Sequence, residues 1–212
     1  MKKAIFLILA ILGWITLIVR LYLRIVESDY TPLESTIQFF TYFTILTNLL
    51  VTIYCTKQLL KTGQQKNSLF DKPETLTAFT VFILIVGIVY HIALKPIWNP
   101  EGLTMVLSEI HHTIVPLLTL VLWIISINEN ELGLKGLLKW LFYPIGYIII
   151  VLIRGSFSNF YPYPFLDVQS LGIQKVLINS FFLLLVMIVL LIIFYYLGNS
   201  IRNKKMANKA YK

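Results

Sequence analysis

The stretch AIFLILAILGWITLIVRLYLRIV, residues 4–26, is apolar and long enough to cross the roughly 30 Å hydrocarbon core of a bilayer as a helix. A helix is required because a lone strand leaves its backbone N–H and C=O groups unpaired in lipid. The run is too long for the apolar part of a signal peptide, and no small-x-small cleavage pattern closes it. We therefore interpret it as an uncleaved first membrane span.

Five further apolar runs follow, and the composition of the whole chain agrees with them. Of the 212 residues, 58% are hydrophobic and 13% are charged, whereas a soluble domain carries about a quarter charged residues. We expect an all-α integral membrane protein, with one bundle of six transmembrane helices in residues 1–198 and a basic tail in 199–212. The predicted spans are residues 4–26, 37–60, 74–95, 104–127, 136–154 and 175–198.

The net charge of +8 comes from Lys and Arg residues that lie mostly between or beyond the apolar runs. With the N-terminus inside, 13 of them fall on the inner side and 5 on the outer side, which predicts that both termini are cytoplasmic. The same distribution argues against a nucleic-acid partner. Cys55 is the only cysteine, which excludes an intrachain disulfide and a Cys-rich metal site.

Ionisable side chains inside the predicted spans gather toward the outer side of the membrane. The segment SEIHHTIVP, residues 108–116, brings a carboxylate and two imidazoles into the outer half of the fourth span. Such groups cost at least a few kcal/mol in hydrocarbon, which makes them functional candidates. The topology places the others in the same leaflet and predicts one polar pocket open to the outer side. The residues concerned are Arg20, Arg24, His91, Glu109, His111, His112 and Arg154.

Helical spacing separates the two adjacent histidines. His112 lies on the polar stripe of the fourth span, with Glu109 three residues before it on the same side. His111 points elsewhere and is expected to pack or to support the site, and His91 is expected to be a hydrogen-bonded structural group. Glu109 is expected to orient His112 or to keep it protonated. One of three arginines should balance this carboxylate: Arg20, Arg24 or Arg154.

A hydroxyl beside an imidazole is the minimum for covalent acyl transfer, because the imidazole takes the hydroxyl proton during attack. Thr44 lies on a polar stripe of the second span. Its predicted depth matches that of His112, roughly 10–12 Å below the outer boundary. These two residues are the candidate nucleophile and base. Asn48 or Arg154 is expected to stabilise the oxyanion of the intermediate.

Metal or cofactor chemistry matches the sequence less well. The three histidines and Glu109 form a conceivable zinc set, but adjacent His111 and His112 point about 100° apart on a helix. No two histidines have the i, i+4 spacing. The chain also contains no Gly-rich phosphate loop and no dinucleotide or haem signature. We therefore expect neither a metal nor an organic cofactor.

The third predicted outer loop contains FYPYPF, residues 160–165, with two prolines and four aromatic residues. This composition prevents a regular helix. One interpretation is an aromatic belt at the membrane surface. The other is a lid or wall over an outward-facing pocket.

Three segments carry a resemblance to a known family: FFTYFTILTN (39–48), HTIVP (112–116) and YPYPFLD (161–167). They resemble the bacterial Pr-six-Pr membrane proteins, which in turn are similar to the eukaryotic androgen-induced, FAR-type membrane hydrolases. The resemblance implies a bacterial-type cytoplasmic membrane protein with a threonine–histidine pair, matched here by Thr44 and His112. It also implies fatty-acid esters of hydroxy fatty acids as substrates. Thr41 and Thr47 are rival positions for the threonine.

The leading hypothesis is an intramembrane hydrolase of lipid or fatty-acid esters, with a membrane lipid as its ligand. A second hypothesis is a transporter that uses Arg20, Glu109 and His112 as a proton- or ion-coupled relay. The inner half of the predicted bundle offers almost no ionisable residue to continue such a path, and no inverted repeat is evident. A third hypothesis is a lipid-binding protein whose polar pocket catalyses nothing.

Overall fold

The computed structural model describes residues 1–61, 68–98, 100–127 and 131–210. Within these ranges the chain is helical and contains no β-strand. Six helical segments are long and apolar enough to cross a membrane, which confirms the predicted number and is consistent with a multi-pass membrane protein. These segments are Lys2–Val26, Phe43–Leu60, Pro73–Leu94, Gly102–Ser126, Leu134–Ser158 and Ile173–Asn208.

Several of these segments consist of more than one helical element. In chain order the elements are α1 (Lys2–Val26), α2 (Pro32–Phe39), α3 (Phe43–Leu60), η1 (Leu69–Asp71), α4 (Pro73–Val89), η2 (Tyr90–Leu94), α5 (Gly102–Glu109), η3 (Ile110–Ile114), α6 (Val115–Ser126), α7 (Leu134–Leu138), η4 (Lys139–Leu141), α8 (Phe142–Ser158), η5 (Pro164–Leu166), α9 (Val168–Leu171) and α10 (Ile173–Ala210). The elements η2 and η3 are single π-helical turns.

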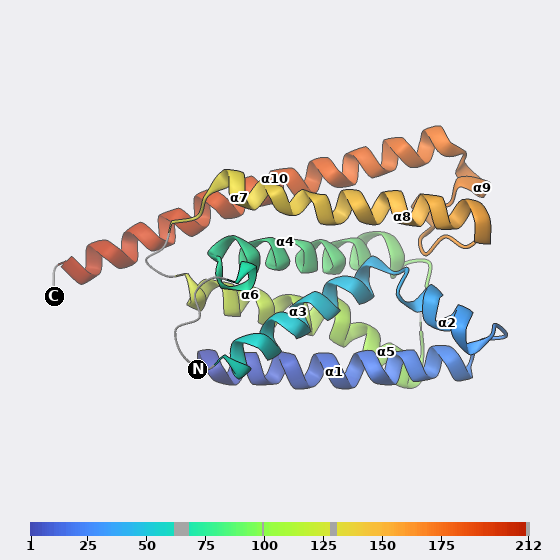
Figure 1. Cartoon of the computed structure of the whole chain (residues 1–212), viewed down its shortest axis with the longest axis horizontal. Helices are drawn as coiled ribbons and strands as arrows, with labels where there is room; N and C mark the ends of the chain where they lie inside the picture. Colours follow the sequence, from blue (N-terminus) through green and yellow to red (C-terminus); the bar gives the residue numbers. More distant parts are fainter. Residues whose placement is uncertain (62–67, 99, 128–130, 211–212) are drawn as a thin grey trace.

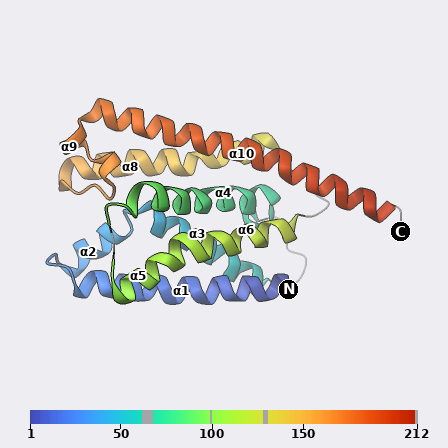
Figure 2. The same cartoon turned by 180° about the vertical axis from the view of Figure 1, so that it is seen from behind.

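The helix α4 lies in the middle of the bundle and has the largest buried share of the six candidate spans. It packs against α3 and α6 on one side and against α10 on the other, while α1 packs against α3 and α6. Figures 1 and 2 show α8 and α10 together on the opposite side of α4 from α1. The N-terminus and the end of α10 lie at the same end of the bundle (Figure 1). The two ends lie together because six helical segments, an even number, run back and forth along the bundle.

The close packing of α1 against α3 depends on a glycine. A Cβ atom on Gly13 would lie 2.0 Å from Oγ1 of Thr52, so only hydrogen fits at this position. Small residues at helix interfaces let two backbones approach, which is how helices without a hydrophobic driving force associate in lipid. This contact holds α3 against α1 and thereby fixes the position of the polar residues at the start of α3.

The second predicted span, residues 37–60, is broken. The helix α2 ends at Phe39, Tyr42 has extended backbone angles, and α3 begins at Phe43. The backbone N–H groups that the break exposes find side-chain partners: Phe43 N donates to the hydroxyl of Tyr147 at 3.2 Å. Thr44 is therefore the second residue of a helix. The sequence prediction had placed it two turns inside one, so the predicted position within the helix was wrong.

The ends of the last two spans also differ from the prediction. The helix α8 continues to Ser158, where Asn159 (φ 56°) adopts the left-handed conformation that ends many helices. The helix α10 does not stop at residue 198 but continues to Ala210. Asn199 bonds both backbone groups of Leu132, which ties this extension to the preceding connection. Most of the predicted basic tail is thus helical.

Candidate active site

The structure brings Thr44 and His112 together. Thr44 Oγ1 lies 3.5 Å from His112 Nε2, and both side chains are buried. This answers a question that the sequence leaves open, since it shows that the second and fourth spans are neighbours at this level. The distance is at the loose end of a hydrogen bond, as is common in catalytic pairs without substrate.

The other ring nitrogen of His112 fixes the proton arrangement. His112 Nδ1 lies 2.8 Å from the backbone oxygen of Ser108. A carbonyl oxygen only accepts hydrogen bonds, so Nδ1 carries the proton. In the neutral ring Nε2 then has a free lone pair, and this lone pair is the one that meets the Thr44 hydroxyl. The backbone of the helix therefore sets the tautomer that a general base requires.

Local irregularities of the helices hold the His112 ring in this place. His112 lies in the π-turn η3. Pro116 follows four residues later and has no N–H, so it cannot donate to the His112 carbonyl. Gly87 lets α4 approach the freed carbonyl, since a Cβ there would lie 2.7 Å from the His112 oxygen. The ring of Tyr90, on the π-turn η2, stacks on the imidazole at 3.9 Å between centroids. Single π-turns of this kind occur frequently at functional sites.

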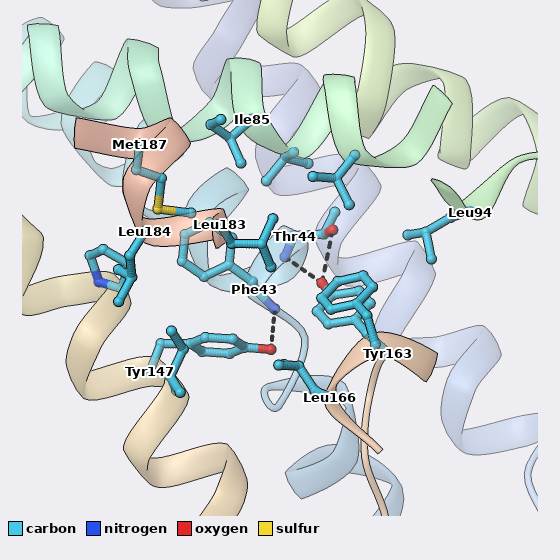
Figure 3. Close-up of a pocket in the computed structure, with 15 residues that line it drawn as sticks. Phe43, Thr44, Ile85, Leu94, Tyr147, Tyr163, Leu166, Leu183, Leu184 and Met187 are labelled. Atoms are coloured by element: carbon cyan, nitrogen blue, oxygen red, sulfur yellow. Dashed lines mark hydrogen bonds between the residues drawn. The ribbon is translucent and has the colours of Figure 1, made fainter. Parts of the chain in front are cut away.

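Tyr163 is the residue that the sequence analysis missed as a member of the site. Its hydroxyl oxygen lies 3.1 Å from the Thr44 backbone nitrogen and 3.2 Å from Thr44 Oγ1 (Figure 3). The oxygen accepts from the Thr44 N–H, so the phenolic proton remains available for Oγ1 or for a substrate oxygen. The residue belongs to the FYPYPF loop, and Pro162 and Pro164 beside it line the same pocket. The loop forms a wall of the pocket, the second of the two sequence interpretations.

Thr44 separates two cavities. The larger, which we call the Thr44 cavity, has a volume of about 450 Å³. It is lined by Arg20, Arg24, Phe39, Tyr42, Thr44, Ile45, Tyr90, Leu94, Ile97, Trp98, Ser108, His111, His112, Pro162, Tyr163 and Pro164. The smaller, the apolar cavity, measures about 50 Å³ and lies between α4, α8 and α10 (Figure 3). Thr44, Leu94 and Tyr163 line both.

His111 and Asn48 act as ties between helices. His111 Nε2 lies 2.9 Å from Thr16 Oγ1, and the Thr16 hydroxyl donates to the Leu12 carbonyl. His111 Nε2 must therefore be the donor, so this nitrogen has no lone pair to act as a base. Asn48 Nδ2 donates to the backbone oxygens of Thr44 and His111 at 2.8 and 3.4 Å. Its amide hydrogens are thus occupied, and the side-chain donor that faces Thr44 Oγ1 is the Tyr163 hydroxyl and not the expected Asn48 amide.

Glu109 does not orient His112. Its carboxylate accepts from Lys95 Nζ at 2.7 Å and from Thr113 Oγ1 at 2.8 Å, and the bond to Glu109 raises the pKa of Lys95. The prediction that an arginine balances the Glu109 carboxylate is therefore also wrong, because Lys95 forms this ion pair. Lys95 was missed because it is the last residue of the predicted third span, at the boundary with the following loop, and no local pattern links it to Glu109.

Two further candidates lie outside the Thr44 cavity. Arg154 pairs with Glu34 on α2 and lines a separate groove, so it does not reach an oxyanion at Thr44. His91 Nε2 bonds Thr113 Oγ1 at 2.9 Å in an exposed position, as expected for a structural group. Of the remaining predicted residues, Arg20 does line the cavity. Among the described residues, no three His, Cys, Asp or Glu side chains gather closely enough to hold a metal ion.

No protein-family model, curated protein or solved structure matches the chain. The architecture and the buried residues therefore define the class: a helical protein with six candidate membrane spans and a threonine–histidine pair in a cavity at one end.

Proposed function

We propose that this protein is a multi-pass membrane hydrolase that cleaves esters of lipids or fatty acids, with Thr44 as nucleophile and His112 as general base. The observation that carries the proposal is the buried Thr44–His112 pair, with Nδ1 of the histidine held by a backbone oxygen. The resemblance to the Pr-six-Pr proteins and the FAR-type hydrolases supports it. The excess of Lys and Arg at the end that holds the termini supports cytoplasmic termini and a site that faces outward.

The first half-reaction transfers the acyl group to the enzyme. Thr44 Oγ1 attacks the ester carbonyl carbon while its proton passes to His112 Nε2, which gives a tetrahedral intermediate. The Tyr163 hydroxyl donates to the oxyanion, and the N-terminus of α3 adds its positive dipole. Collapse of the intermediate breaks the bond to the alcohol oxygen, which takes the proton from His112. The products are the free alcohol and an acyl ester of Thr44.

The second half-reaction restores the enzyme. His112 Nε2 accepts a proton from water as the water oxygen attacks the acyl carbon. A second intermediate forms with the same contact to Tyr163, and its collapse releases the carboxylic acid. The proton on His112 returns to Thr44 Oγ1. The apolar cavity beyond Thr44 is lined by side chains such as Ile85, Leu184 and Met187 and is suited to the start of an acyl chain.

The proposal is tested with purified protein in detergent or nanodiscs, using p-nitrophenyl esters of fatty acids and a fluorophosphonate probe. Thr44→Ala and His112→Ala should lower hydrolysis by about 10³-fold or more and abolish labelling.

Matched controls come from groups of the same kind outside the cavity. Thr41 donates its hydroxyl to the Ile37 carbonyl and Thr47 bonds the Tyr143 hydroxyl, so Thr41→Ala and Thr47→Ala should remain active, as should His91→Ala. Parent-like turnover and labelling of the Thr44 and His112 variants would disprove the mechanism. Co-purified lipid that is bound without any turnover by the parent would indicate a binding protein instead.

A further inference from the structure

Two arginines on α1 line the Thr44 cavity, and neither has an acidic partner among the described residues. Arg20 Nη1 reaches only the backbone oxygen of Thr104, at 3.5 Å, and its guanidinium lies 5.5 Å from the ring of Trp98. Arg24 Nη2 donates to the amide oxygen of Gln38, and its Nε is buried without a partner. Both side chains are partly buried.

Three carboxylates lie near the arginines: Glu27 attracts Arg20 from beyond ion-pair distance, and the other two are already used by other cations. Glu34 pairs with Arg154, and it also accepts from Gln38 Nε2 at 2.9 Å. Glu109 pairs with Lys95. Gln38 thus gives Arg24 a neutral partner. The carboxylate that Gln38 contacts, Glu34, forms its ion pair with Arg154. Two positive charges remain at the cavity, in an environment where an unpaired charge is costly.

We propose that Arg20 and Arg24 form an anion-binding subsite, and that the lipid held in the Thr44 cavity carries a carboxylate or a phosphate monoester on its alcohol portion. A guanidinium presents a planar set of donors that matches either group, and both anions supply the missing negative charge. The buried Nε of Arg24 gains a partner in the same step.

The arrangement of the two cavities gives the bound lipid a direction. The anionic group lies at the arginines, the ester carbon lies at Thr44, and the acyl chain continues past Tyr163 into the apolar cavity. With a carboxylate as the anion, this geometry fits the fatty-acid esters of hydroxy fatty acids that the resemblance implies, and the new element is that Arg20 and Arg24 bind the anion. This part rests on the proposed hydrolase, whereas binding of the anion does not require turnover.

Three single-chain amphiphiles with the same tail test the subsite by equilibrium binding to the full-length protein in nanodiscs of phosphatidylcholine. They are hexadecanoate, hexadecyl phosphate and hexadecanol. Trp98, which faces Arg20, provides a fluorescence signal close to the subsite. At least one of the two anions should bind about tenfold or more tightly than the neutral alcohol. Whichever anion binds more tightly identifies the head group.

The double variant Arg20→Gln/Arg24→Gln should lose this preference and still bind hexadecanol, which shows that it is folded. Lys175→Gln removes one charge at an exposed position on α10 outside the cavity and should keep the preference. Equal binding of all three amphiphiles by the parent, or an unchanged preference in the double variant, would overturn the proposal. Loss of the preference in Lys175→Gln would assign it to overall charge and would also overturn it.

The two proposals fail separately. If Thr44→Ala and His112→Ala hydrolyse esters like the parent, the hydrolase mechanism is wrong while an arginine-dependent preference for anions still stands. If hydrolysis depends on both residues and the parent shows no preference for an anion, the subsite alone is wrong.

Discussion

The two ends of the bundle each contain a polar cavity, and the two cavities treat their charges differently. The cavity at the end that holds the termini, the Asp71 cavity, measures about 200 Å³ and includes Lys2, Lys61, Asp71 and Lys72. There Lys61 pairs with Asp71 at 2.6 Å, and Lys2 and Lys72 are exposed. In the Thr44 cavity, the partly buried arginines have only neutral partners. Polarity alone therefore does not distinguish the two cavities, whereas the pairing of their charges does.

The threonines show the same contrast. Many threonines inside the helices donate their hydroxyls to the carbonyl four residues earlier, as Thr52 does to Asn48 and Thr119 does to Val115. This contact hides a hydroxyl in lipid. Thr44 lies in the first turn of α3, so the carbonyl four residues earlier belongs to Phe40, before the helix begins. Its hydroxyl faces Tyr163 and His112 instead. The break before α3 is therefore what frees the candidate nucleophile.

In a comparison of tyrosine hydroxyls near Thr44, the largest loss of activity is expected when the Tyr163 hydroxyl is removed. Tyr163→Phe should lower kcat for ester hydrolysis by about 10²–10³-fold, the usual effect of losing one oxyanion donor, with little change in KM. Tyr147→Phe is the matched control. The Tyr147 hydroxyl also accepts from a backbone N–H at the start of α3, but its proton is used by the Thr41 carbonyl. Equal losses of kcat in the two variants would show that the Tyr163 hydroxyl only caps the start of α3 and does not stabilise the oxyanion.

A smaller effect compares two glycines, one behind each cavity. Gly87→Ala places a Cβ 2.7 Å from the His112 backbone oxygen, which cannot move without shifting η3. We expect it to lower the free energy of unfolding by about 1–3 kcal/mol and to reduce hydrolysis. Gly198→Ala places a Cβ 2.4 Å from Leu132 Cδ1, the end of a flexible side chain. It should be near neutral in SDS unfolding titrations and in activity. A neutral Gly87→Ala would show that η3 is not held by this contact.

Much of this arrangement was predictable, because the physical signals are strong. Apolar runs of sufficient length define the six spans. The cost of an imidazole in lipid pointed to His112, and the threonine stripe pointed to Thr44. Their contact could be proposed from depth and face, although Thr44 was expected inside a continuous helix and lies at the start of one.

Other features depend on tertiary contacts that no local pattern encodes. The residues around the break, Phe40–Tyr42, contain neither proline nor glycine. The break is stabilised from outside, by tyrosine hydroxyls that arrive from α8 and from the 160–165 loop. Glu109 forms an ion pair with Lys95, which lies on the other side of the connection between η2 and α5. No rule of helical spacing predicts such a pair. The composition of the loop left a belt and a wall as alternatives and did not show which tyrosine reaches Thr44; Tyr163 does, and its ring stacks on Phe165.

The smallest expected effect lies in the Asp71 cavity. The hydrogen bond from Lys61 lowers the pKa of Asp71 below its usual value. The ion pair therefore contributes stability above pH about 4, the ordinary pKa of the carboxyl in the unfolded chain, and this contribution disappears as the pH falls through the lower folded value. Asp71→Asn should lower the free energy of unfolding by under about 1 kcal/mol at pH 7, and the difference from the parent should shrink toward pH 3. Hydrolysis should not change. An activity loss comparable to that of Tyr163→Phe would mean that the two ends are coupled, and the contrast between a structural and a reactive cavity would no longer hold.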